Sequence, residues 1–354
     1  MFARCAAAWV VCAGILFASG TASAQTQSVI LQIGSQVPSL SALPFYVADK
    51  AGFFADDKLS VEIRYTANAP TATQIIATGN ADIGMMTNEP IIMGYAKGVH
   101  AKMFFVHQRP LNYYVGIPEA SPIHTIADLK GKNIGVSNLG SAAVPVLRSM
   151  MRTVGAEAGR DYTLVPVGVL DQALAALRTN RVAAVAMWES QFAAFHRIGF
   201  PMRYLRHPTL ADFGNTGLFA SEQTIKNKPE ALCGMGRATL KAMIFIRENP
   251  TAALHIYWEV NPAARAGKDE ASVLASGMRE IEYMIKGYRP YKDGQKDFGL
   301  VDHKGFERYM QMFKDEGLLK EVPPINDLVT DQFIACSNKI DAAAVRQKAR
   351  NWKK

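Results

Sequence analysis

The chain lacks the short motifs that mark common catalytic and nucleotide-binding sites. Its 354 residues contain no Gly-x-Ser-x-Gly elbow, no P-loop, no Gly-x-Gly-x-x-Gly turn after a strand and no His-Glu-x-x-His helix. The seven histidines are dispersed and do not have the spacing of metal ligands. Gly234-Met235-Gly236 lies inside a helical pattern and is too short for a phosphate-binding loop. The sequence therefore predicts neither a cofactor nor a metal, and it argues against an enzyme.

Long apolar runs are also absent, apart from one near the N-terminus. Arg4 precedes an almost unbroken apolar run over residues 5–18, and Ala22-Ser23-Ala24 fits an A-x-A cleavage site. The run is too short to span a membrane comfortably, and no later segment reaches about 18 apolar residues. We therefore expect residues 1–24 to be a cleaved signal peptide and the mature chain to be periplasmic.

Cysteine is scarce, and two of the four cysteines lie in the predicted signal peptide. Cys233 and Cys336 remain, and two thiols in an oxidising compartment often pair. A bridge over this separation would constrain the unfolded chain by roughly 4–5 kcal/mol in the loop-entropy model. The alternative is a pair of unlinked, buried thiols.

The sequence has no concentrated basic surface. Lys and Arg number 39 against 31 Asp and Glu, which gives a formal net charge of +8, but the basic residues are scattered along the chain. A nucleic-acid-binding protein would be expected to combine a basic stripe with interleaved aromatic residues. We therefore expect no nucleic-acid partner.

Strand and helix patterns alternate through residues 29–198, and the chain becomes nearly all helical after Gly217. The expected strands are 29–34, 59–65, 81–85, 102–107, 113–117, 133–136, 162–167 and 182–187. The expected helices are 41–51, 71–78, 90–97, 142–154, 171–178, 189–198, 229–248, 269–285 and 303–316. A weak repeat at an offset near 100 relates residues 31–34 to residues 132–135. The alternation predicts an α/β protein with mostly parallel sheets flanked by helices.

Polar residues gather at four predicted strand-to-helix turns. Ligands of open α/β sheets bind beyond the carboxyl ends of the strands, where helix starts offer free N–H groups to an anion. The expected ligand contacts at these turns are Ser35, Gln36, Ser39, Asn68, Thr71, Asn88, Glu89, Ser137 and Ser141. The competing interpretation is that these residues only cap their own helices.

Residues near the predicted chain crossings complete the candidate site. Trp188 directly follows a strand and would pack on the apolar part of a ligand, and Glu189 would accept a hydrogen bond from a ligand amine or hydroxyl. His107 and Asn215 flank the crossings and are further candidates. The alternative is that Trp188 belongs to a core and that Glu189 simply begins its helix.

The order of several segments resembles a known family. Residues 43–54, 59–63, 77–84 and 126–136 together resemble the periplasmic solute-binding proteins of ABC importers, in the NMT1/THI5-like branch of nitrate, sulfonate, taurine and thiamine-pyrimidine binders. The resemblance implies a two-lobed type II periplasmic-binding-protein fold with two hinge crossings and a helical C-terminal portion. Lobe I would hold residues 25–112 and 213–354, and lobe II would hold residues 113–212, with hinges at 107–112 and 213–216.

The family resemblance also implies a function. We expect an extracytoplasmic protein that captures a small organic anion or heteroaromatic compound between its lobes and delivers it to an ABC permease in the inner membrane. The expected partners are thus the small-molecule ligand and the permease, and the protein itself is expected to be a monomer. The alternatives are an exported enzyme on the same fold acting on a sulfur or nitrogen compound, and a ligand-delivering subunit of a membrane sensor. Cysteine-dependent enzymes of this fold are disfavoured, because no cysteine lies near the mature N-terminus.

Overall fold

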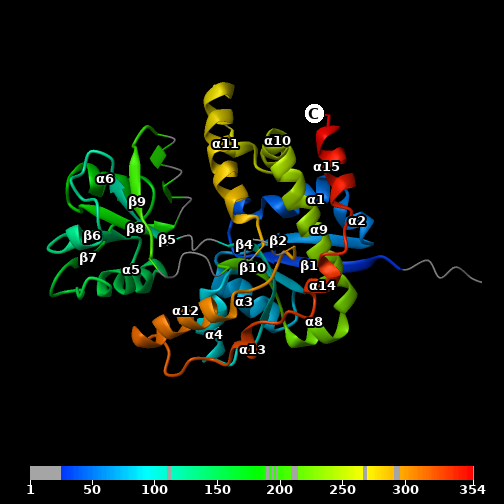
Figure 1. Cartoon of the computed structure of the whole chain (residues 1–354), viewed down its shortest axis with the longest axis horizontal. Coiled ribbons are helices and arrows are strands. Elements are labelled where there is room, and N and C mark those ends of the chain that lie inside the picture. Colours follow the sequence, from blue (N-terminus) through cyan, green and yellow to red (C-terminus); the bar gives the residue numbers. More distant parts are fainter. Residues whose placement is uncertain are drawn as a thin grey trace, which may run out of the picture.

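The computed structural model describes residues 25–109, 113–188, 191–192, 195–196, 198–208, 214–265, 269–290 and 296–353. The predicted signal peptide, Glu189 and parts of both predicted hinges lie outside the described residues. Within them the chain forms two lobes, each built on a five-stranded sheet (Figure 1). We call the lobes the sheet-A lobe and the sheet-B lobe.

Sheet A has the strand order β2-β1-β3-β10-β4. Its strands are β1 (Gln27–Ile33), β2 (Leu59–Tyr65), β3 (Ile83–Thr87), β4 (Lys102–Gln108) and β10 (Thr216–Ala220). β1 pairs in parallel with β2 and β3, whereas β10 is antiparallel to both of its neighbours. The start of β10 therefore lies at the same edge as the carboxyl ends of β1, β3 and β4.

Sheet B repeats this plan with the strand order β7-β6-β8-β5-β9. Its strands are β5 (Tyr113–Pro118), β6 (Asn133–Val136), β7 (Thr163–Pro166), β8 (Ala184–Trp188) and β9 (Met202–Leu205). β5 is the antiparallel member, and its first residue, Tyr113, pairs with Trp188 at the carboxyl end of β8. The expectation of an α/β fold with mostly parallel sheets is therefore confirmed, with one antiparallel strand inside each sheet.

Helices cover both faces of sheet A, and the elements described after β10 are all helices (Figure 1). The described helices of the first 220 residues are η1 (Leu40–Ala42), α1 (Leu43–Lys50), α2 (Phe53–Asp56), α3 (Ala69–Ala77), α4 (Glu89–Tyr95), η2 (Ala127–Leu129), α5 (Ala143–Arg152) and α6 (Asp171–Arg178). Those that follow are α8 (Glu222–Asn227), α9 (Pro229–Glu248), α10 (Pro250–Val260), η3 (Pro262–Ala264), α11 (Glu270–Gly287), α12 (His303–Asp315), α13 (Ile325–Leu328), α14 (Ile334–Ser337) and α15 (Ala342–Arg350). None of the helices in the described part of the chain is both long and apolar enough to cross a membrane.

Two strands were not expected from the sequence, β9 and β10. All five residues of β10 are buried, so the strand shows no alternation of polar and apolar residues. It also contains Gly217, where a Cβ atom would come within 2.6 Å of the Phe105 carbonyl oxygen of the neighbouring strand. Glycine normally weakens a strand, but this close backbone approach requires it.

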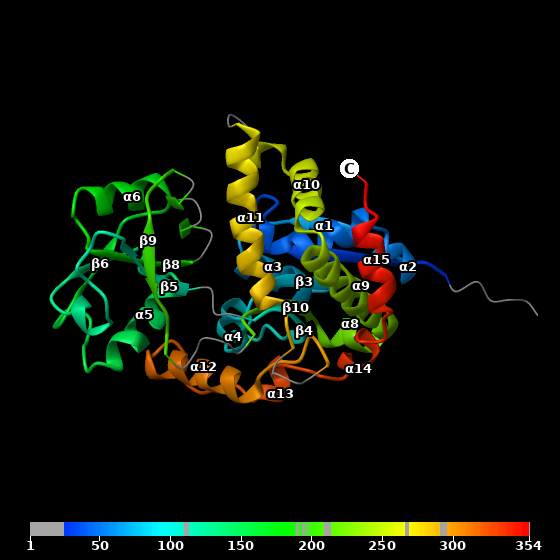
Figure 2. The same ribbon diagram turned by 45° about the horizontal axis from the view of Figure 1, so that its top comes forward.

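Helix α12 connects the two lobes in addition to the chain crossings. In Figures 1 and 2 it extends from the sheet-A lobe to beneath α5 of the sheet-B lobe. From the middle of the helix the Tyr309 hydroxyl donates to Glu89 Oε1 of the sheet-A lobe at 2.5 Å. Just beyond its C-terminal end, Glu316 lies 2.8 Å from the Arg152 guanidinium of α5. Apolar residues of α12 and α5 share one hydrophobic cluster, so the contact between them is packed as well as charged.

Cys233 and Cys336 form a disulfide, with Cα atoms 5.5 Å apart. The bridge joins the long helix α9 to the short helix α14, and both lie in the sheet-A lobe. Of the two alternatives that the sequence left open, the structure therefore has the disulfide.

Candidate functional site

A cavity of about 1220 Å³ lies where the two sheets face each other across the chain crossings. Sheet A contributes residues at the carboxyl ends of β1, β3 and β4 and at the start of β10, namely Ile33, Met85, Met86, Thr87, Gln108 and Thr216. Sheet B contributes Tyr113 and Trp188, the paired residues of β5 and β8. This is the edge of an open α/β sheet at which ligands bind.

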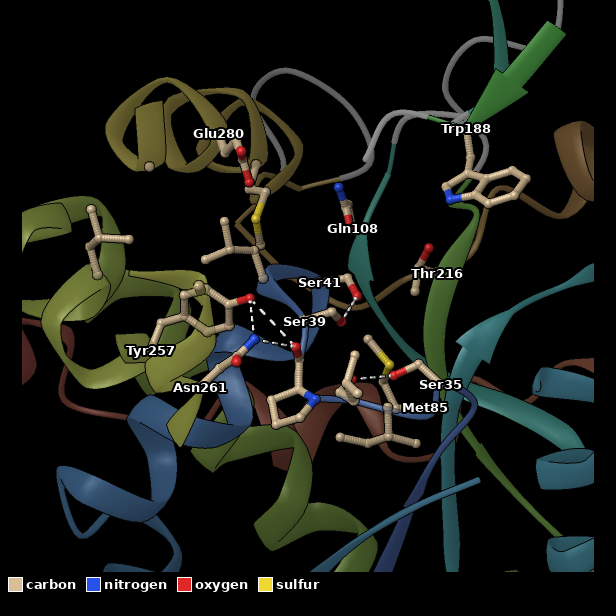
Figure 3. A pocket seen from close by; sticks show the side chains of 18 of the residues that line it. Ser35, Ser39, Ser41, Met85, Gln108, Trp188, Thr216, Tyr257, Asn261 and Glu280 are labelled. Carbon is tan, nitrogen blue, oxygen red and sulfur yellow. Dashed lines mark hydrogen bonds between the residues drawn. The ribbon is translucent and has the colours of Figure 1, made fainter. Parts of the chain in front are cut away.

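The first strand-to-helix turn, which runs through Ser41, forms the floor of the cavity (Figure 3). The hydroxyls of Ser39 and Ser41 lie 2.7 Å apart, and that of Ser35 donates to the Val37 carbonyl at 2.7 Å. No side-chain hydrogen bond from Ser39 caps the short helix η1 that follows. The two paired hydroxyls share one hydrogen bond, which leaves one hydroxyl hydrogen for a ligand.

Helices α10 and α11 form a wall that sequence reasoning missed. Tyr257 and Trp258 of α10, Asn261 beyond its end, and Ser276 and Glu280 of α11 line the cavity. Figure 3 shows Trp188 on the opposite side of the cavity from Tyr257. A signal for this wall exists in the sequence, because small and polar residues recur on α11 at the spacing of one helix face: Ser272, Ala275, Ser276 and Arg279.

Arg279 is the only cationic residue among the described residues of the cavity wall. Its side chain is exposed, and it has no hydrogen bond or ion pair within the described part of the chain. Burial, and then the charge of Arg279, lower the pKa of His196 in the sheet-B lobe. Arg279 therefore supplies a positive charge at the cavity wall.

Four of the predicted contacts line the cavity, namely Ser35, Ser39, Asn68 and Trp188. Asn68 also caps α3, because its Oδ1 accepts from the backbone N–H of Thr71 at 2.9 Å. Both interpretations of Asn68, ligand contact and helix cap, thus have a structural basis.

The other described candidates do not line this cavity: Gln36, Thr71, Asn88, Glu89, His107, Ser137, Ser141 and Asn215. The Ser141 hydroxyl accepts from the N–H of Ala143, the first residue of α5, at 3.3 Å. The fourth predicted turn, which carries Ser137 and Ser141, thus contributes nothing to the cavity in this arrangement of the lobes. A role in ligand binding for these residues stays a prediction, as does that of Glu189 outside the described residues.

His107 supports the floor of the cavity from below. The ring is 1% exposed, and its Nε2 lies 3.3 Å from the Ser41 carbonyl oxygen. Burial lowers the pKa of His107 to about 4, which the Ser41 contact only partly counteracts. The ring is therefore neutral near pH 7 and donates its Nε2–H to Ser41.

Asn88 and Glu89 lie buried behind the cavity wall. Asn88 Nδ2 donates to the Gly214 carbonyl at 2.9 Å and so joins the end of β3 to the second chain crossing. Burial raises the pKa of the Glu89 carboxyl. Hydrogen bonds from Thr87 and Tyr309 lower it, but the effect of burial is larger. Burial also raises the pKa of the Tyr113 hydroxyl, and the charge of Glu89 adds to that effect. Thr87 and Tyr113, unlike Glu89, do line the cavity.

The described residues contain no group of three or more His, Cys, Asp or Glu side chains arranged to hold a metal ion. Both cysteines of the described part are linked in the disulfide, so neither offers a thiol. The chemistry that the described walls of this cavity carry is therefore that of hydrogen-bonding hydroxyls and amides, aromatic faces, one arginine and one glutamate.

Comparison with known proteins places this geometry in context. The chain is 20% identical over 305 residues to the riboflavin-binding protein RibY of Chloroflexus aurantiacus, covering 85% of this chain and 84% of the relative. It is 24% identical over 218 residues to the formylaminopyrimidine-binding protein of Halalkalibacterium halodurans, covering 60% of this chain and 64% of that relative. The alkanesulfonate-binding protein SsuA of Xanthomonas axonopodis pv. citri, solved with bound MOPS, superposes with a TM-score of 0.64 at 18% identity and covers 87% of this chain and 100% of that one.

These similarities agree with the architecture. The two-lobed fold is that of the SsuA neighbours, as the family resemblance implied. The model of the family described as "NMT1/THI5 like" matches residues 40–253, from the floor of the cavity to the start of α10. Since the match takes in more than half of the chain, this protein belongs to the NMT1/THI5-like family.

Proposed function

We propose that this protein is the substrate-binding component of an ABC importer, which captures a small compound in the cavity between its lobes. The observation that carries the proposal is the position of the cavity, at facing edges of two sheets that are joined by chain crossings. Movement of one lobe toward the other would exclude water from a bound compound and strengthen its hydrogen bonds. The closed form would then present a distinct surface to a permease.

The walls of the cavity favour a planar heteroaromatic ligand. Trp188 and Tyr113 on one side and Tyr257 and Trp258 on the other supply aromatic faces, on which a flat ring can stack. The Ser39 and Ser41 hydroxyls can hydrogen-bond to ring nitrogens or carbonyl oxygens. A riboflavin-binding and a formylaminopyrimidine-binding protein are among the relatives, which supports the same class.

An organic anion is the second ligand class that the cavity supports. Arg279 offers a guanidinium that forms no ion pair with any described residue, and the first turn offers hydroxyls. Arg279 and its neighbour Glu280 both line the cavity, so the net charge of this stretch of wall is close to neutral. A carboxylate or sulfonate carried on an aromatic ring would use both the aromatic faces and the arginine.

The proposal includes export to the periplasm. The apolar segment with its A-x-A site supports a cleaved signal peptide over residues 1–24. The Cys233–Cys336 disulfide is consistent with an oxidising compartment. Mass spectrometry of the protein from a periplasmic extract tests this, because a mature chain that begins at Gln25 is expected.

Calorimetric titration tests the binding proposal directly. Riboflavin, formylaminopyrimidine and MOPS represent the flavin, pyrimidine and sulfonate classes, and at least one of them is expected to bind with a 1:1 stoichiometry. Native mass spectrometry of protein purified without added ligand provides an independent search for a retained compound. If none of the three compounds binds and no compound is retained, the proposal is wrong.

The same experiments separate the two alternatives. An enzyme would return the compound chemically altered, so the bound compound is recovered after incubation and its mass is compared with that of the starting material. A sensor subunit would bind its compound equally well but would stimulate no uptake by vesicles that contain the permease. Unaltered compound together with uptake supports the importer.

A further inference from the structure

Helix α10 holds the floor of the cavity through one backbone carbonyl. Asn261 Nδ2 donates to the Pro38 carbonyl oxygen at 3.0 Å, and the Tyr257 hydroxyl donates to the same oxygen at 3.4 Å. Asn261 Nδ2 also lies 3.0 Å from the Tyr257 hydroxyl oxygen. An amide nitrogen carries two hydrogens, so one of them serves Pro38 and the other serves Tyr257. Figure 3 shows this closed triangle of hydrogen bonds at the base of the cavity.

The residue after Pro38 is the first of the paired serines. The Ser39 backbone N–H donates to the Tyr46 hydroxyl at 3.3 Å, and the Ser39 hydroxyl meets that of Ser41. The Ser41 carbonyl in turn accepts from His107. Pro38 and Ser41 are therefore anchored through their carbonyls, while the hydroxyls between them remain at the cavity. The first turn is therefore held by contacts from α10, α1 and β4, in addition to its own hydrogen bond from the Ala42 N–H to the Ser39 carbonyl.

The hydrogen bond from the Asn261 side chain to Pro38 is not needed to end helix α10. Pro262 follows it, and proline cannot continue the hydrogen bonding of α10. The backbone N–H of Asn261 already bonds to the Tyr257 carbonyl at 2.8 Å. The side chain is thus free to reach a residue 223 positions earlier in the chain. Asn261 also lies beyond residue 253, where the match to the family model ends.

We infer that Asn261 is a positioning residue, which fixes the Ser39–Ser41 hydroxyl pair for ligand binding by holding the Pro38 carbonyl. Binding weakens steeply when a contact group is displaced, because a hydrogen bond requires both distance and angle. The part of the chain after the family match would then determine how the first turn meets its ligand. This inference rests on the proposed function only in taking the cavity to be a ligand-binding site. The hydrogen bond between Asn261 and Pro38 is present in the protein without a ligand.

The chain offers a matched control at the other end of the same helix. Asn249 Nδ2 donates to the Ala349 carbonyl at 2.9 Å, and its Oδ1 caps α10 by accepting from the Ala252 N–H at 3.0 Å. Asn261→Asp and Asn249→Asp each keep the size of the side chain, remove one amide-to-carbonyl hydrogen bond and add one negative charge. Asn261→Asp also removes the donation to the Tyr257 hydroxyl, which can donate to the new carboxylate instead. Asp caps a helix as well as Asn does. The two variants therefore differ mainly in whether the lost bond leads to the cavity floor.

Hydrogen–deuterium exchange of the ligand-free protein decides the proposal. The Ser39 and Ala42 amides are hydrogen-bonded in the first turn, to the Tyr46 hydroxyl and to the Ser39 carbonyl respectively. In Asn261→Asp we expect peptides over this turn to exchange roughly 3- to 10-fold faster than in the wild type, the effect of losing one hydrogen bond. In Asn249→Asp we expect wild-type exchange there. Equal exchange of the turn in both variants would overturn the proposal, whether or not any ligand is known.

A double-mutant cycle with riboflavin as the probe then separates positioning from direct contact. If Asn261 acts through the serine pair, Asn261→Asp weakens binding roughly 3- to 10-fold, and combining it with Ser39→Ala weakens binding no further than Ser39→Ala alone. Additive losses would mean that Asn261 touches the ligand directly, which contradicts the inference. Failure of riboflavin to bind the wild type bears on the proposed function alone, because the exchange experiment requires no ligand.

Discussion

The buried His107 makes a testable link between the cavity floor and the pH dependence of stability. Burial lowers its pKa from 6.5 to about 4 in the folded protein. The unfolded chain binds a proton at this position below its ordinary pKa, and the folded protein does so only near pH 4. The contribution of His107 to stability is therefore fully present above the unfolded pKa and is lost as the pH falls toward the folded pKa.

The size of the effect follows from the two pKa values. Between about pH 7.5 and about pH 5, preferential protonation of the unfolded chain at this one site lowers the free energy of unfolding by about 2 kcal/mol. Other groups contribute over the same range. The pKa of His207 is also lowered to about 4 by burial, and that of the Glu89 carboxyl is raised, which acts in the opposite direction. A variant is therefore needed to isolate His107.

His107→Gln supplies this comparison. Glutamine does not titrate, and its amide can still donate to the Ser41 carbonyl. Urea unfolding of both proteins at about pH 7.5 and at about pH 5 gives four free energies of unfolding. When the loss on acidification in the variant is subtracted from that in the wild type, the contributions of His207 and Glu89 cancel. We expect the variant to lose about 2 kcal/mol less than the wild type on acidification. An identical loss in both proteins would refute the argument that His107 is buried in its neutral form.

Three further predictions concern the bridge, the cavity wall and the long helix α9. Reduction of Cys233–Cys336 is expected to lower the free energy of unfolding by about 4–5 kcal/mol, measured by urea unfolding with and without reductant; a loss below about 1 kcal/mol would contradict the loop-entropy reasoning. Trp188→Ala is expected to weaken binding of the cavity's ligand roughly 3- to 10-fold in calorimetry, with a nearly unchanged melting temperature of the empty protein; a large drop in melting temperature without any loss of affinity would place Trp188 in the core instead. Gly236→Ala is expected to destabilise by about 1–3 kcal/mol, because the new Cβ would lie 2.0 Å from Ser337 Oγ and 2.6 Å from Ser337 Cβ. Gly234→Ala is the control, because its new Cβ would come no closer than 3.2 Å to Leu59, and it is expected to change the stability by less than about 1 kcal/mol. Equal losses of stability in the two variants, measured by thermal unfolding, would argue against a clash with Ser337.

The local pattern of the sequence determined most of the individual elements. The strands at 59–65 and 133–136 and the helices at 171–178 and 229–248 have the predicted bounds. Their periodicity is local, since it depends on which face of a single strand or helix is buried. The two sheets and their flanking helices follow from the alternation of these elements, and three of the four expected turns contribute residues to the cavity, among them Ser35, Asn68 and Thr87.

Only the tertiary structure decided what completes the cavity and what lies behind it. Strand β10 has no periodicity of its own, because it lies between β3 and β4 inside sheet A and both of its faces are buried. His107 and Glu89, expected at the ligand, lie behind the wall, because polarity in the sequence does not reveal which face of an element meets the solvent. The wall formed by α10 and α11 lies more than 200 residues further along the sequence than the first turn. The two nevertheless meet in space, where Asn261 bonds to Pro38. Contacts over such a separation are fixed by the packing of the whole chain, and no short pattern in the sequence encodes them.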